Sequence, residues 1–139
     1  MAKSTANKAQ QIAKAALDFE QKLSGRLPKS VSVVMGESTL VITLQDALSP
    51  AERWLAKSPE GAAQVQEFYR QLFHTSVNSL QQDIERITGV DVHEATAELE
   101  PANGAVVQAF ASGTVVQIFL LKSAVPSETW SGSAEPDLS

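Results

Sequence analysis

The sequence has no cysteine among its 139 residues and only two histidines, His74 and His93. The first absence excludes disulfide bonds, cysteine-ligated zinc and catalytic thiols. Neither a His-x-x-x-His nor a His-Glu-x-x-His pattern occurs, so zinc binding on a helix is not indicated. Glu94, Glu98 and Glu100 could gather on one strand face around a cation, but the loop of Gly and Asp that usually holds such a cation is missing. We predict no metal site and no cofactor.

Long apolar runs are also missing. No segment approaches the roughly 20 apolar residues that cross a bilayer, and residues 1–27 carry basic side chains without the apolar stretch of a signal peptide. The formal net charge is −5, which argues against binding to phosphate backbones. We therefore expect a soluble cytoplasmic protein that binds no nucleic acid and does not insert directly into a membrane.

The motifs of common enzyme sites do not occur either. The chain has no Gly-x-Ser-x-Gly elbow, no Gly-x-x-x-x-Gly-Lys phosphate loop and no Gly-x-Gly-x-x-Gly fingerprint. A nucleophile with a base and an orienting acid cannot be identified. We predict no catalytic residues and expect that the protein is not an enzyme.

What the sequence does contain is helical periodicity in two segments. Apolar residues at helical spacing predict helices over residues 5–24 and about 60–88, each followed by a glycine that ends it. Between them, Ser49-Pro50-Ala51-Glu52 predicts the start of a short helix. Ser can cap the free N–H groups, Pro suits the first helical position, and Glu can bond back to the cap.

Apolar and polar residues alternate in four further segments, which predicts strands. These segments are residues 30–35, 39–46, 105–111 and 114–121. Residues 90–104 fit either a further strand, at 91–99, or an insertion loop.

Ser112-Gly113 predicts a two-residue turn that sets the register of the last two strands, with Ala111 opposite Thr114. In that register, one sheet face meets the helices and the other is apolar around two glutamines. The predicted helix-facing residues are Val107, Ala109, Val116, Ile118 and Leu120. The predicted outer residues, which we assign to an interface between copies, are Val106, Gln108, Phe110, Val115, Gln117 and Phe119.

Together these elements predict an α+β fold. We expect a two-layer sandwich, in which a mostly antiparallel sheet of four to five strands carries the N-terminal helix and the long helix on one face. We place this single domain at residues 1–122. Residues 123–139 are rich in Ser, Pro and acidic groups, so we expect a flexible tail.

Gly25-Arg26-Leu27-Pro28-Lys29 is the most distinctive polar segment. It places two cations between a helix end and a strand start, where they either complement the negative helix end or contact an anion or a partner. With Arg53 in the short helix, Arg26 and Lys29 are the candidate ligand-binding residues.

Several blocks, in this order, resemble the family of MpsC-like proteins. The blocks are Gly25 to Val31, Leu48 to Arg53, Ile87-Thr88-Gly89, Val107 to Ser112 and Val116 to Leu121. The resemblance covers about residues 10–122. The sequence departs from the family by an insertion at residues 90–104 and by Ser112-Gly113, which replaces a longer polar loop.

The resemblance implies a cytoplasmic accessory or regulatory subunit. The family takes its name from a soluble component of a bacterial system that generates membrane potential by cation translocation and is linked to uptake of inorganic carbon. On this basis we expect a non-enzymatic interaction module that contacts a membrane-protein partner. The half-apolar outer face of the predicted sheet adds the expectation of a homo-oligomer. The alternative is a sensor of a small anion or ligand, with Arg26, Lys29 and Arg53 near a pocket.

Overall fold

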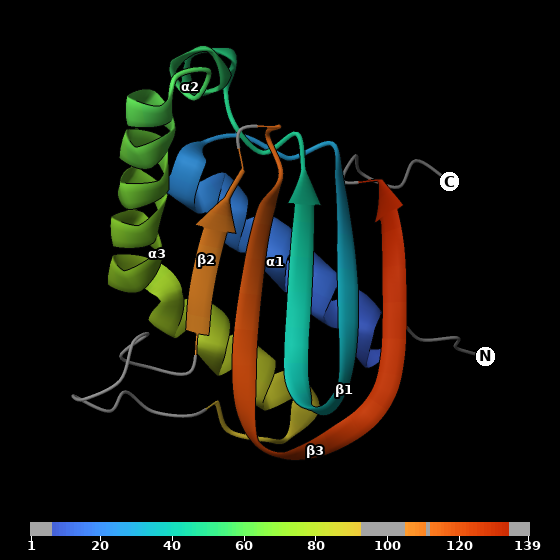
Figure 1. Cartoon of the computed structure of the whole chain (residues 1–139). Coiled ribbons are helices and arrows are strands. Elements are labelled where there is room, and N and C mark those ends of the chain that lie inside the picture. The colour runs from blue at the N-terminus through green and yellow to red at the C-terminus, as the bar shows by residue number, and fades with distance from the viewer. Residues whose placement is uncertain (1–6, 93–104, 111, 134–139) are drawn as a thin grey trace, which may run out of the picture.

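Helices and strands follow one another in an α+β arrangement, as the sequence predicts. The computed structural model describes residues 7–92, 105–110 and 112–133. In chain order the elements are α1 (Lys8–Ser24), β1 (Ser30–Gln45), α2 (Pro50–Leu55), α3 (Pro59–Thr88), β2 (Ala105–Ala109) and β3 (Val115–Ser133). α1 and α3 cross one face of the sheet, and α2 stands at one end of the molecule, at the top of Figure 1.

The helix boundaries follow from local capping. α1 begins after an Asn7 cap and ends at Gly25, whose φ of 77° only glycine adopts easily. α3 ends in the same way at Gly89, with a φ of 75°. α2 begins with the predicted capping box: the Ser49 hydroxyl accepts from the Glu52 amide at 3.2 Å, and the Glu52 carboxylate accepts from the Ser49 amide at 2.8 Å.

Among the residues that the structure describes, the sheet has three antiparallel strands in the order β1-β3-β2. β1 reverses direction near Glu37, which has a left-handed φ of 51°. The Lys29 amide donates to the Gln45 carbonyl oxygen at 2.8 Å, so the two ends of β1 lie side by side (Figure 1). The predicted strands at 30–35 and 39–46 are thus the two arms of β1, joined by this reversal. The predicted sheet of four to five strands and the two-layer sandwich are not confirmed.

β3 pairs with both parts of β1. Its first part, Val115–Leu120, lies opposite Leu44 to Thr39, and its second part, Glu128–Ser133, lies opposite Met35 to Ser30. The prediction of a flexible tail is therefore wrong for residues 123–133, which belong to β3. Residues 134–139 lie outside the described residues.

The amino-acid composition did not predict the second part of β3, because this part is held by main-chain hydrogen bonds to β1. Such hydrogen bonds need no apolar side chains. Two side chains add to them. The Glu128 carboxylate accepts from the Ala9 amide at 3.0 Å, at the positive N-terminal end of α1. Trp130 is half-buried against the core.

The register between β2 and β3 differs by one residue from the predicted one. Val107 lies opposite Gln117, and Ala109 lies opposite Val115. The Phe110 amide donates to the Thr114 carbonyl oxygen at 2.8 Å, so three residues separate the last pair instead of two. The predicted partner of Thr114, residue 111, lies outside the described residues.

A one-residue slip turns every side chain of a strand to the other face. Val107 and Ala109 are buried as predicted, but between Val115 and Leu120 of β3 the buried residues are Val115, Gln117 and Phe119. Val116, Ile118 and Leu120 lie on the face away from the helices, where Leu120 is 46% exposed. The predicted helix-facing and outer residues of β3 are therefore exchanged.

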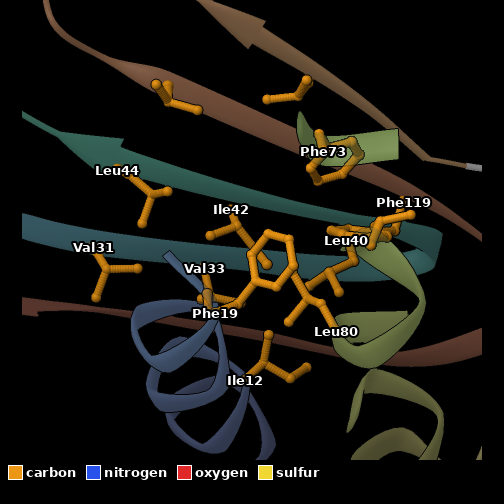
Figure 2. Close-up of a cluster of buried hydrophobic side chains, with 14 of the residues drawn as sticks. Ile12, Phe19, Val31, Val33, Leu40, Ile42, Leu44, Phe73, Leu80 and Phe119 are labelled. Atoms are coloured by element: carbon orange, nitrogen blue, oxygen red, sulfur yellow. The ribbon is translucent and has the colours of Figure 1, made fainter. Parts of the chain in front are cut away.

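The helices and the sheet meet in a single hydrophobic core, part of which Figure 2 shows. Phe73 of α3 is its centre: its ring lies 6.2 Å from that of Phe19, edge to face, and 6.0 Å from that of Phe119. Phe19 comes from α1 and Phe119 from β3, so these contacts join both helices to the sheet.

α3 also covers the free edge of β2. The Gln66 side-chain amide donates to the Val107 carbonyl oxygen at 3.1 Å and accepts from the Ala109 amide at 2.6 Å. One glutamine thus satisfies main-chain groups that a further strand would otherwise pair with.

Candidate functional site

A shallow depression of about 390 Å³ lies beside α2. Its walls come from the α1–β1 connection, the β1–α2 connection and α2 with the residues that follow it. The lining residues are Arg26, Asp46, Leu48, Pro50, Arg53, Trp54 and Lys57. Three cations against one carboxylate give the depression a positive character, which favours an anionic ligand or surface.

Arg26 is the most buried of these cations. It directly follows Gly25, the left-handed residue that turns the chain out of α1. Its Nη2 donates to the Leu48 carbonyl oxygen at 3.4 Å. Its Nε is buried and meets no acceptor among the residues that the structure describes. A buried donor without an acceptor is costly, so this N–H is a suitable partner for a ligand oxygen.

Arg53 is held loosely. Its Nη1 lies 3.2 Å from a carboxylate oxygen of Asp46, with side chains 51% and 45% exposed. An ion pair in such an exposed position contributes about 0–1 kcal/mol. Arg53 can therefore exchange Asp46 for another anion at little cost.

Trp54 projects into solvent at the rim of the depression. It is 72% exposed, and the Lys57 ammonium lies 4.7 Å from its ring centroid. That distance is a cation–π contact. No residue of α2 is buried, so the apolar side chains of this helix contribute little to the core.

The structure brings two of the three predicted ligand residues together. Arg26 and Arg53 both line the depression, whereas Lys29 does not. Lys29 instead begins the pairing of the two ends of β1, and its side chain is exposed. Trp54 and Lys57 were not among the site residues predicted from the sequence. Their spacing of three residues could have indicated that the two side chains contact each other, because residues three apart are neighbours on a helix surface.

Close to the depression lies a buried carboxyl group, that of Glu20 in the last turns of α1. Glu20 is 1% exposed. Burial raises the pKa of Glu20 from 4.5 to about 7; the nearby Ser24 hydroxyl lowers this pKa, and the Glu52 carboxylate raises it. Ser24 has one hydroxyl proton and donates it to the Glu20 main-chain oxygen at 3.0 Å. Neither carboxyl oxygen therefore has a good hydrogen bond from the described residues.

Tyr69 of α3 connects this carboxyl group to α2. Its hydroxyl lies 3.4 Å from both the Ala47 carbonyl oxygen and the Glu52 carboxylate. Burial, together with the Glu20 and Glu52 charges, raises the pKa of Tyr69, so its hydroxyl stays protonated and acts as a donor. Glu52 thus caps α2 and at the same time fixes α2 to α3.

The six predicted interface residues do not share one surface. Of the five whose side chains are described, Val115, Gln117 and Phe119 are buried, and Gln108 and Phe110 are exposed. The side chain of Val106 lies outside what the structure describes. The face of the sheet away from the helices instead exposes Val34 and Leu120, by 50% and 46%.

Metal ligands do not gather in the described part of the chain. No group of three or more His, Cys, Asp or Glu side chains there is placed to hold a metal ion. His74 lies on α3, with its ring 5.9 Å from that of Phe73. His93 and the predicted Glu94, Glu98 and Glu100 group lie outside the described residues. Within the same described ranges, no helix has the length and apolar character needed to cross a membrane.

A family model described as "Na+-translocating membrane potential-generating system (MpsC)" matches residues 4–112. The chain belongs to the MpsC family. This confirms the resemblance carried by the sequence blocks. No curated protein and no solved structure matches the chain. All lining residues of the depression lie within the MpsC match, whereas β3 begins beyond it, at Val115.

Proposed function

We propose that this MpsC-family chain is a non-enzymatic, cytoplasmic accessory subunit of a Na+-translocating or inorganic-carbon transport system in the membrane. The family description, which names a system that generates membrane potential, carries the proposal. The chain would act by protein binding, in contact with a membrane-protein partner. Its exposed apolar side chains, on the sheet and on α2, offer surfaces for such contacts.

Loss of the chain should lower the Na+-dependent part of the membrane potential in its native cell. A voltage-sensitive dye measures this part as the difference between medium with Na+ and medium with K+. Reintroducing the wild-type chain should restore it. An unchanged Na+-dependent potential in the deletion strain would contradict an accessory role in such a system.

We further propose that the chain forms a homo-oligomer through the sheet face away from the helices. Val34 and Leu120 are exposed there, and Val41, Val116 and Ile118 are half-buried beside them. This face replaces the predicted one, because Phe119 is in the core. Light scattering should give a mass above 14.9 kDa.

Leu120→Ser should reduce that mass to one chain, whereas Phe68→Ser, a matched exposed residue on α3 at 51% exposure, should not. A wild-type mass equal to a single chain would rule out the oligomer.

The basic depression favours a second candidate function, a sensor of a small anion. Arg26, Arg53 and Lys57 converge there, and the Arg26 Nε lacks an acceptor among the described residues. A ligand at 100 times its Kd stabilises the folded state by about 2.7 kcal/mol, which thermal unfolding detects readily. Bicarbonate or phosphate should raise the Tm of the wild type but not that of Arg26→Gln.

Arg86→Gln is the matched control, because Arg86 pairs on the surface with Asp83 at 3.2 Å, outside the depression. The absence of any shift with bicarbonate, phosphate and nucleotides would speak against the sensor.

A further inference from the structure

α2 presents apolar side chains that the fold does not use. Trp54 is 72% exposed and Leu55 is 43% exposed, next to each other in the chain. α2 projects at one end of the molecule, past the ends of the strands (Figure 1). Adjoining exposed apolar side chains with a rim of polar residues are a mark of interaction surfaces.

Cations lie beside Trp54, because Arg26, Arg53 and Lys57 line the same depression. Lys29 is linked to the edge of the depression through its main chain, since its amide donates to the carbonyl oxygen of Gln45, the residue before Asp46. We call Arg26, Lys29, Arg53, Trp54, Leu55 and Lys57 the α2 end.

The nearest carboxylates compensate this charge only in part. Asp46 pairs with Arg53, and Glu52 points inward to the Ser49 amide and the Tyr69 hydroxyl. Glu60 follows at the start of α3. Arg26, Lys29 and Lys57 form no ion pair with the described residues. The whole chain carries a net charge of −5, so this positive surface is local.

An exposed Trp flanked by Lys and Arg is the combination that membrane proteins place at the bilayer surface. The indole ring is apolar with one polar N–H, which suits the headgroup layer, and the cations attract anionic lipids. A free phosphate or bicarbonate would use the cations but would leave Trp54 and Leu55 in water. A lipid surface uses both.

We propose that the α2 end docks on the headgroup layer of an anionic bilayer, with Trp54 and Leu55 inserted to headgroup depth and the cations on lipid phosphates. This contact is peripheral and does not cross the bilayer. The expectation from the sequence that the chain does not insert directly into a membrane then holds only in the sense that no segment of the α2 end spans the bilayer. The inference goes beyond the proposed function, because it requires lipid only and no protein partner.

The test is co-sedimentation of the purified full chain with vesicles. The chain should bind vesicles that contain one-third phosphatidylglycerol, should not bind vesicles of phosphatidylcholine alone, and should be released by high salt. Each cation near the surface contributes about 1 kcal/mol, so Lys57→Gln should weaken partitioning about fivefold. Removing the apolar pair with Trp54→Ala and Leu55→Ala should weaken it about tenfold or more.

Phe68→Ser is the matched control, because Phe68 is also exposed, by 51%, but lies on α3 and outside the α2 end. It should bind like the wild type. Trp130→Phe leaves Trp54 as the only tryptophan, so a blue shift of its emission on anionic vesicles reports insertion directly.

Absence of binding to anionic vesicles at low salt would overturn the proposal, as would equal binding to neutral vesicles or an equal loss in Phe68→Ser. A Tm increase with soluble glycerol phosphate, without vesicle binding, would also overturn it and would assign the cations to a soluble anion. None of these outcomes changes the cellular measurement of Na+-dependent potential, so the two proposals fail separately.

Discussion

Replacement of Glu20 by Gln should stabilise the protein at neutral and alkaline pH. Glu20 is 1% exposed, and its carboxyl group interacts electrostatically with Glu52 of α2 and Tyr69 of α3. Gln has nearly the same shape but never carries a charge, so the substitution removes only the cost of burying a carboxylate.

The size of the effect follows from the raised pKa. Burial raises the pKa of Glu20 from 4.5 to about 7, so between these values the folded state holds a proton that the unfolded state has released. This stabilising contribution is fully present below pH 4.5 and is lost as the pH rises through about 7. The interval corresponds to about 3 kcal/mol, an order-of-magnitude figure.

Urea unfolding followed by circular dichroism measures the effect. The difference in free energy of unfolding between Glu20→Gln and wild type should grow by about 3 kcal/mol in favour of the variant between about pH 4.5 and pH 8. Asp18→Asn is the control, because Asp18 is an exposed carboxylate on the same helix, and it should follow the wild type. If the free energies of unfolding of Glu20→Gln and wild type changed with pH in parallel, the conclusion that Glu20 is a buried carboxyl group without compensating hydrogen bonds would be refuted.

Three further substitutions test the core, a helix cap and the sheet edge. Phe73→Ala should lower the free energy of urea unfolding by about 3–5 kcal/mol, because the ring is fully buried, and a loss below about 1 kcal/mol would contradict its central position. Ser49→Ala should cost about 1 kcal/mol in the same assay, since it removes the α2 cap, whereas an unchanged stability would show that the cap contributes nothing. Gln66→Ala should cost about 1–2 kcal/mol and should increase concentration-dependent association in light scattering, because it uncovers the edge of β2; an unchanged mass would show that this edge needs no cover.

The candidate site illustrates what sequence reasoning could and could not reach. Arg26 was predicted because it lies between a helix end and a strand start, and Arg53 was added from the short helix; the structure brings both to the depression. Lys29 stood out for the same reason, but the pairing of Lys29 with Gln45 commits its main chain to the sheet. The exposure of Trp54 could not be predicted, because an apolar residue in a short helix is usually buried.

The sequence by itself determined the helices and their ends, because caps such as Ser49 with Glu52, and glycines such as Gly25, act through groups within a few residues of one another. It also determined the family, through blocks that lie in the right order. Only the tertiary structure decided which face of β3 is buried, that residues 123–133 form a strand, and that Glu20 is enclosed. Those outcomes depend on main-chain partners and covering helices far away along the chain, and no local pattern of apolar residues encodes them.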